Sequence, residues 1–288
     1  MPAPPPALSA DAMVVSNDAL ILMGLGVVFA ALTLVEMRRP LMKQAAGSDR
    51  RLLANFGLGV LNLMMSAVIP LTTVATAELA RRNGWGLLNL VAAPAWIAVP
   101  ATVAAASLAQ YAIHRLAHHW PLLWRLHRVH HCDTAVDLST TLRSHPAELL
   151  VVIPWIGVVA AAMGLSPVTL AAYQVVALGF GLLGHANIAL PDRLDGWLRR
   201  LLVTPSMHHV HHSVDQSETD SNYGEVFSVW DHLFGTHVRR DAAYLADMRR
   251  GLGPDMDEGA DRLLTQVLLP LRGARPAVTP QSVGTPPA

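Results

Sequence analysis

Long runs of apolar residues fill much of the first two thirds of the chain. Three of them, 19–36, 52–80 and 87–113, are almost wholly apolar, and prolines interrupt the second run at Pro70 and the third run twice. A helix rises about 1.5 Å per residue, and a bilayer core is crossed by about 20 residues. Each run therefore predicts a membrane helix, tilted or kinked where a proline occurs.

Two further apolar stretches, 147–163 and 168–190, are separated by the turn-forming sequence Gly-Leu-Ser-Pro. This pattern predicts a helical hairpin. The first arm has only about 17 residues and contains Pro154, so it either crosses the bilayer fully or enters it part-way. In both cases the chain returns to the side that it left.

These patterns divide the chain into four parts and predict an all-α fold, a polytopic bundle of four to five membrane helices with a cytoplasmic His-rich helical cap. The parts are a disordered leader (1–18), membrane helices (19–113), a His-rich catalytic region that includes the membrane hairpin at 147–190 (114–240), and a C-terminal part (241–288). The C-terminal part contains an amphipathic pattern at 257–272, followed by a Pro-rich tail that we expect to be disordered.

The composition agrees with a membrane protein. Of 288 residues, 52% are hydrophobic and only 15% are charged, whereas soluble chains average about 25% charged residues. The 21 basic residues match the 21 acidic ones, so the clustered positive charge of a nucleic-acid-binding protein is missing. The single cysteine, Cys132, excludes an intramolecular disulfide.

The charged residues of the connectors predict the orientation. The connector after the first apolar run carries five basic residues, Arg38, Arg39, Lys43, Arg50 and Arg51, and the next connector only two. Because cytoplasmic loops are enriched in Lys and Arg, the first connector is expected in the cytoplasm. Counting crossings from there places 114–146 and 191–288 on the same side, so the protein is expected to be an integral multi-pass protein with its histidines at the cytoplasmic face.

All fourteen histidines lie between positions 114 and 237, and eight of them have a helical spacing. One pair is spaced i, i+4, and two triplets are spaced i, i+3, i+4, which places each set on one helix face. The eight residues are His114 and His118, then His127, His130 and His131, then His208, His211 and His212. In the last set, His209 could replace His208 by spacing alone.

Eight imidazoles are too many for one metal ion, since a metal site of this kind uses about four protein ligands. They fit two ions that each keep an open position, and two open metals beside a membrane suggest dioxygen chemistry. Imidazole binds iron, copper, nickel and zinc, so spacing does not choose the element, but redox chemistry excludes zinc. The alternative is a membrane metal transporter or sensor that holds zinc through the same clusters.

The other histidines are less clearly assigned. His185 ends an apolar helix and is expected as a ninth ligand, because an ionisable group there is a functional candidate. His145 is equally consistent with a ligand, a partner of a ligand or a helix start. The remaining histidines, His119, His209, His232 and His237, are expected to be structural.

The spaced histidines, together with Asn222-Tyr223-Gly224 and the ending Trp230-Asp231-His232-Leu233-Phe234-Gly235-Thr236, resemble the fatty acid hydroxylase / sterol desaturase superfamily over roughly residues 95 to 240. The superfamily comprises integral membrane non-haem di-iron enzymes. Its HxxxH and two HxxHH boxes correspond to 114–118, 127–131 and 208–212, which selects His208 over His209.

The resemblance implies a membrane-bound oxidoreductase that hydroxylates or desaturates a lipid, using two iron ions, O2 and two electrons. The eight spaced histidines and His185 would bind the metals. No fused cytochrome b5 or flavin domain is apparent, so a separate ferredoxin or cytochrome b5-type protein with its reductase is the expected electron donor.

Two other polar residues are candidates for contacts with the ligands. Asn187 could orient a ligand or a metal-bound water, or it could cap a helix end. Asp231 could accept a hydrogen bond from a ligand imidazole, or it could pair with an arginine.

Overall fold

The computed structural model describes residues 10–42, 49–253 and 257–273, with side chains at 23–42 and from Arg50 onward. The secondary structure of these ranges is helical apart from isolated β-bridges, so the all-α prediction is confirmed. The longer helices are α1 (Ala10–Arg38), α2 (Asp49–Val68), α3 (Thr73–Arg82), α5 (Ala95–His119), α7 (Leu149–Met163) and α8 (Pro167–His185).

The remaining helices are short and connect or cap the long ones. The α-helices are α4 (Leu87–Leu90), α6 (Pro121–His131), α9 (Asp192–Leu198), α10 (Pro205–His211), α11 (Gln216–Thr219), α12 (Val229–Phe234), α13 (Ala242–Asp247) and α15 (Leu263–Leu268). Three 3₁₀ turns are η1 (Leu138–Leu142), η2 (Pro146–Glu148) and η3 (Leu269–Leu271).

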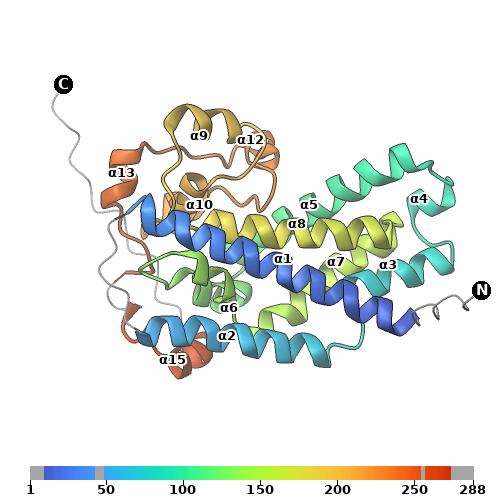
Figure 1. Cartoon of the computed structure of the whole chain (residues 1–288), viewed down its shortest axis with the longest axis horizontal. Coiled ribbons are helices and arrows are strands. Elements are labelled where there is room, and N and C mark those ends of the chain that lie inside the picture. Colours follow the sequence, from blue (N-terminus) through green and yellow to red (C-terminus); the bar gives the residue numbers. More distant parts are fainter. Residues whose placement is uncertain (1–9, 43–48, 254–256, 274–288) are drawn as a thin grey trace, which may run out of the picture.

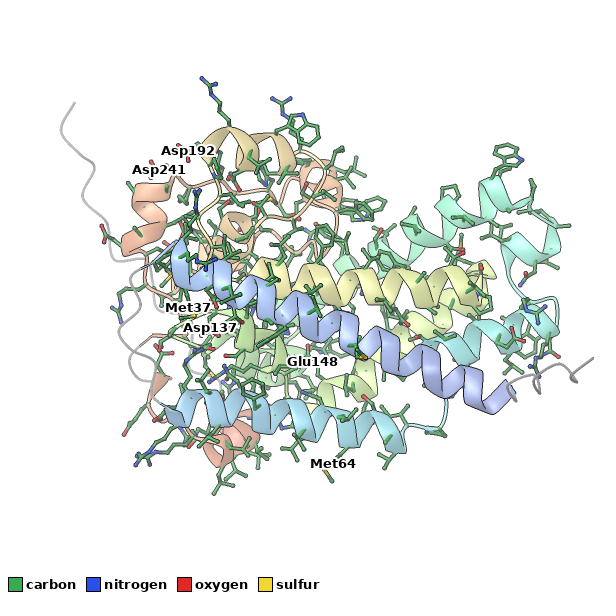
Figure 2. All side chains as sticks on the ribbon, in the orientation of Figure 1. Met37, Met64, Asp137, Glu148, Asp192 and Asp241 are labelled. Carbon is green, nitrogen blue, oxygen red and sulfur yellow. The ribbon has the colours of Figure 1, made fainter. Side chains whose placement is uncertain are left out.

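Four helical stretches within the described residues are long and apolar enough to cross a membrane. They are Arg50–Leu90, Ala95–His119, Pro146–Met163 and Pro167–His185. The predicted membrane helix at 19–36 lies within α1, which is not one of the four. Large apolar side chains point away from the bundle; Met64 of α2, which is 61% exposed, is an example that can be seen in Figure 2. Such a surface is suited to lipid rather than to water, and the chain is a membrane protein.

The prolines of the apolar runs differ in their effect on the helices. Helix α2 ends at Val68, and α3 begins only after Pro70, with the Thr72 hydroxyl accepting from the Ala75 amide at the new N-terminus. Proline lacks an amide hydrogen and cannot continue the hydrogen-bond ladder. Pro100, by contrast, is accommodated inside α5.

Small residues bring α3, α5, α7 and α8 together. Ala77, Ala106, Ala160 and Ala177 are all at most 2% exposed and belong to one apolar cluster, which allows the close helix packing typical of membrane proteins. At the end of the bundle near α4, Gly86 has a φ of +90°, and a Cβ there would lie 2.1 Å from the Gly164 amide nitrogen. Only glycine fits this contact.

The His-bearing helices lie at one end of the bundle and α4 lies at the other. Figure 1 shows α6, α9, α10 and α13 gathered at the end where α5 and α8 terminate. The bundle therefore brings together segments that are separated in the sequence by the α7–α8 hairpin. The connector charges predict the same arrangement, because they place 114–146 and 191–288 on one side of the membrane.

Two predicted segments differ from the structure. Helix α1 begins at Ala10 rather than after position 18, because no proline or glycine occurs between positions 7 and 23; residues 1–9 of the leader and the tail from 274 lie outside the described residues. The helix predicted over 257–272 is shorter, since the positive φ of Gly259 (+75°) and Pro270 confine it to α15 and η3. Buried Leu269 packs this segment against α6.

Candidate metal centre

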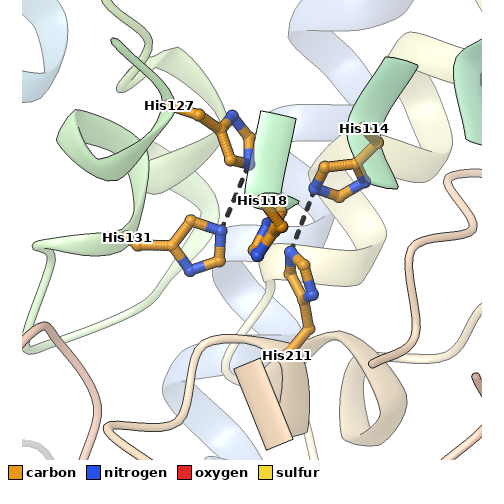
Figure 3. Close-up of side chains that lie close together, drawn as sticks. All are labelled: His114, His118, His127, His131 and His211. Carbon is orange, nitrogen blue, oxygen red and sulfur yellow. Dashed lines mark hydrogen bonds between the residues drawn. The ribbon is translucent and has the colours of Figure 1, made fainter. Parts of the chain in front are cut away.

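Nine histidines form two groups where α5 and α8 end. The first group takes side chains from α5, α6 and α10, and the second from α6, α8 and the end of α10. The first contains His114, His118, His127, His131 and His211, and the second contains His130, His185, His208 and His212. Within each group, one ring nitrogen of every histidine lies within 4.8 Å of those of the others. Figure 3 shows the first group, with the rings converging on a common centre.

Helices α6 and α10 each supply both groups. In α6, His127 and His131 are one turn apart and join the first group, while His130 joins the second. In the same way, α10 gives His211 to the first group and directs His208 to the second. The groups consequently adjoin.

The outer ring nitrogens of most of these histidines face hydrogen-bond acceptors. Four Nδ1 atoms lie 2.7–3.1 Å from backbone carbonyl oxygens. The pairs are His114 with Tyr223, His130 with Arg143, His185 with Gly181 and His211 with Ser221. A carbonyl oxygen can only accept, so in a neutral ring each Nδ1 carries the proton and Nε2 keeps its lone pair.

The inner Nε2 atoms of the same rings face one another. His114 and His211 approach to 3.0 Å between their Nε2 atoms, and His130 and His185 also approach to 3.0 Å. With the protons held at Nδ1, neither member of such a pair has a hydrogen to donate. Lone pairs that face each other at this distance are stabilised by a cation between them, so the donor set fits a metal ion in each group.

Burial keeps these imidazoles neutral. It lowers the pKa of His130, His131, His208 and His212 well below the usual value, and that of His211 to about 3. Neutral imidazole is the form that binds metal. Several buried nitrogens, including His131 Nδ1, His212 Nδ1 and both nitrogens of His118, also lack hydrogen-bond partners among the described residues. Unpartnered polar atoms of this kind are costly when buried, and a bound metal would use the nitrogens that face the centre.

A carboxylate that the sequence did not single out holds one of the rings. His127 Nδ1 lies 2.8 Å from Glu148 Oε1, and Glu148, labelled in Figure 2, is half-buried at the end of η2. A second carboxylate, Asp220, lies near the first group, with its Oδ1 3.4 Å from His118 Nδ1 but without a hydrogen bond to it. A carboxylate in the position of Glu148 orients a metal-binding imidazole and raises its basicity. Glu148 follows His145-Pro146 by two residues, a local signal that could have identified it.

The three additional polar candidates contact other parts of the chain. His145 caps η2, with its Nδ1 accepting from the Ala147 amide, and it belongs to neither group. Asn187 exchanges two hydrogen bonds with the backbone of Met42 instead of contacting an imidazole. It thereby fixes the segment after α1 to the segment after α8.

Asp231 acts on the ligand set only through the backbone. Its carboxylate accepts from the amides of Tyr223 and Gly224, and the Tyr223 carbonyl oxygen faces His114 Nδ1. The expected direct bond from Asp231 to an imidazole, or to an arginine, is replaced by this turn. Asp231 bonds to these amides because α12 places its carboxylate beside the turn at 223–224.

The four histidines expected to be structural have structural contacts. His209 is fully buried, with Nε2 3.2 Å from the carbonyl oxygens of His185 and Ala186 and Nδ1 accepting from Arg250 Nε at 3.1 Å. It joins the end of α8 to α10. The others, His119, His232 and His237, contact Arg115, Arg199 and Asn222 respectively.

A cavity of about 320 Å³ reaches both groups of histidines. Its walls come from α5, α7 and α8, and apolar side chains such as Ile113, Leu149 and Val152 provide most of the lining. His114 lines it from the first group and His185 from the second. An apolar chain placed in this cavity would lie against both candidate metal positions.

Comparison with known proteins agrees with this geometry. Residues 99–236, slightly less than half of the chain, match the fatty acid hydroxylase family. Over these residues the chain is similar to fatty acid hydroxylases. The match includes all three histidine boxes and confirms the resemblance predicted from the motifs.

Curated relatives are similar to part of the chain. It is 37% identical over 127 residues to the ornithine lipid hydroxylase OlsE of Rhizobium tropici, and 33% identical over 126 residues to the alkylglycerol monooxygenase of Homo sapiens. It is 32% identical over 135 residues to the very-long-chain aldehyde decarbonylase GL1-6 of Oryza sativa subsp. indica. Each alignment covers 44% of this chain, but only 37%, 27% and 20% of the respective relative. No solved structure matches the chain.

Proposed function

We propose that the protein is a membrane-bound oxidoreductase that hydroxylates or desaturates a lipid, with one iron ion in each histidine group. The observation that carries the proposal is the paired arrangement of Nε2 lone pairs beside an apolar cavity. The names of the relatives support it, because two of them are a lipid hydroxylase and an alkylglycerol monooxygenase. The similarity to fatty acid hydroxylases supports it as well.

The proposed ligands are the nine grouped histidines, five for one ion and four for the other. Imidazole ligands suit iron, and reduced iron would supply the activation of O2 needed to oxidise an unactivated C–H bond. Hydroxylation consumes one lipid C–H, O2, two electrons and two protons, and it yields an alcohol and water. Desaturation consumes two C–H bonds with the same co-reactants and yields an alkene and two water molecules.

The residues of this chain prepare that reaction in three ways. Backbone carbonyls and Glu148 hold the outer ring protons, which keeps the inner lone pairs directed at the metals. The apolar wall of the cavity, including Ile113 and Val152, excludes water and binds the lipid chain. Helices α5 and α8 are candidate membrane spans that carry His114 and His185 near their ends and form walls of the cavity. A lipid would therefore enter the cavity laterally, from the bilayer between the membrane helices.

The electron donor and the side of the membrane are part of the same proposal. Basic residues near the end of α1, such as Arg38 and Arg39, support a cytoplasmic location of the histidine-bearing end. A separate ferredoxin or cytochrome b5-type protein with its reductase would deliver the two electrons there.

The test measures iron and oxidation in the same preparations. The full chain, purified in detergent, is assayed for metal content and for O2-dependent conversion of total membrane lipids, with ferredoxin, its reductase and NADPH under ¹⁸O2. We expect two iron ions per chain, and His131→Ala and His208→Ala should each lose iron and product. The control His119→Ala, at an exposed histidine outside both groups, should retain both.

The outcome separates the proposal from its rivals. Incorporated ¹⁸O identifies hydroxylation, whereas a product lighter by two hydrogens identifies desaturation. Zinc in both groups, with metal flux into vesicles and no O2-dependent change in lipid, would refute the enzyme and support a transporter.

A further inference from the structure

Two polar side chains, Gln110 and Glu225, line the largely apolar cavity about one helical turn below the histidines. Gln110 lies four residues before His114 in α5, which corresponds to about 6 Å along the helix. Glu225 lies against Gly181 of α8, because a Cβ on that glycine would be 3.8 Å from Glu225 Oε1. Gly181 in turn lies four residues before His185, so both polar groups are at the same level below the candidate metals.

These two side chains have unused hydrogen-bonding capacity. Gln110 Oε1 accepts from the Tyr173 hydroxyl at 2.5 Å, which leaves both hydrogens of its amide nitrogen without a partner among the described residues. The carboxyl group of Glu225 likewise makes no hydrogen bond or ion pair with the described part of the chain, although it lines the cavity. Both residues are half-buried, and polar groups that face an apolar cavity without partners gain free energy when a ligand supplies those partners.

The environment of Glu225 strengthens this interpretation. Burial raises the pKa of Glu225 to about 7, because no neighbouring cation stabilises the carboxylate. A carboxyl group in this state can accept or donate a hydrogen bond, depending on its partner. A simple alkyl chain would leave both Glu225 and the Gln110 amide unsatisfied.

We propose that Gln110 and Glu225 form a recognition site for a hydroxyl group of the lipid substrate, about one helical turn from the carbon that is oxidised. A hydroxyl group satisfies both residues, since its oxygen accepts from the Gln110 amide and its hydrogen is donated to the Glu225 carboxyl. The inference rests on the proposed function, because it takes the cavity as the lipid site. It narrows the substrate to a lipid with a hydroxyl close to the reacting position.

The space around Gln110 accommodates the rest of such a lipid. A second cavity of about 270 Å³ shares Gln110 and Val152 with the first cavity. It extends toward Thr72 and Thr73, at the break between α2 and α3. A long chain fixed by its hydroxyl at Gln110 and Glu225 would therefore have room on both sides of the recognition site.

The experiment compares two probes that differ only in the hydroxyl group. Equilibrium binding of tritiated 1-hexadecanol and tritiated hexadecane is measured for the full chain in detergent, with empty micelles subtracted. A buried hydrogen bond to a charged or polar group changes affinity by about tenfold or more. We expect the wild type to prefer hexadecanol by at least this factor, and Glu225→Leu and Gln110→Leu each to reduce the preference several-fold.

Two further variants separate recognition from general packing. Val152→Ala removes an apolar part of the same wall and should weaken the binding of both probes alike, with their ratio unchanged. Glu225→Gln keeps the shape and hydrogen-bonding ability of the side chain, so it should retain a preference for hexadecanol even if Glu225→Leu does not fold.

The result can overturn the inference without affecting the proposed function. A wild-type protein that binds both probes equally, or Leu variants that keep the full preference, would refute the recognition site even where iron and lipid oxidation are present. Conversely, a preference that depends on Gln110 and Glu225 would support the site even where no iron-dependent oxidation is found.

Discussion

Replacing Glu225 by glutamine is expected to stabilise the protein at alkaline pH. In the folded protein, burial raises the pKa of Glu225 from 4.5 to about 7. The folded state therefore binds this proton more tightly than the unfolded state does. The associated stabilisation is complete below pH 4.5 and is lost as the pH rises through about 7.

The size of the effect follows from this shift. One pKa unit corresponds to about 1.4 kcal/mol, so a change from 4.5 to about 7 makes the ionised carboxylate cost about 3 kcal/mol of folding free energy at pH 8. At pH 5 the folded-state carboxyl is protonated, and the cost falls below about 1 kcal/mol. Glutamine carries no charge and avoids the cost at both pH values.

Thermal unfolding of the purified chain in detergent measures the difference. A chain of this size changes its Tm by roughly 2–4 °C per kcal/mol, so Glu225→Gln should raise the Tm by roughly 6 °C or more at pH 8 and by much less at pH 5. The control is Glu258→Gln, at an exposed carboxylate. The difference in Tm between this variant and the wild type should be the same at pH 5 and at pH 8. An unchanged Tm for Glu225→Gln at pH 8 would show that the carboxyl group is hydrated or paired, contrary to the reasoning.

Three other substitutions test the surroundings of the histidines. His209→Ala leaves Arg250 Nε without its buried partner, so it should lower the free energy of unfolding by about 1–3 kcal/mol. Metal analysis of this variant should still find both ions. Loss of an ion would instead show that His209 is a ligand. Glu148→Ala removes the hydrogen-bond partner of the His127 ring, so it should weaken metal binding about 10–100-fold in a chelator competition. An unaltered metal affinity would show that Glu148 does not orient His127. Gly224→Ala places a Cβ 2.5 Å from the Phe227 carbonyl oxygen, so we expect a loss of about 1–3 kcal/mol in thermal unfolding; a wild-type Tm would show that the turn is free to shift.

The features that sequence reasoning predicted well depend on local geometry. A spacing of i, i+3, i+4 fixes one helix face whatever the rest of the fold does, and for this reason the nine grouped histidines were all singled out from their spacing or their place at a helix end. The interruption at Pro70 is equally local, since a proline cannot donate an amide hydrogen to the helix ladder, although α5 continues through Pro100. The length and hydropathy of the apolar runs depend only on composition, and they predicted the four candidate membrane spans, whereas the run at 19–36 is not one of them.

The remaining features depend on contacts between distant segments. The division into five and four histidines requires the packing of α6 and α10, which no spacing contains. Asn187 pairs with Met42 across 145 residues, so its partner could not be read from its neighbours. The position of Glu225 beside Gly181 is of the same kind, because the two residues meet only after the α7–α8 hairpin has returned to the cap.

The sharing of α6 and α10 between the two histidine groups has a consequence for how metal is acquired. An ion bound by His127, His131 and His211 would fix both helices, and these helices also carry His130, which belongs to the other group. The first ion would thus remove much of the conformational entropy that the second ion must otherwise overcome. Titration of the metal-free protein should consequently be cooperative, with chains that hold a single ion rare at intermediate loading, and independent filling of the two groups would refute this coupling.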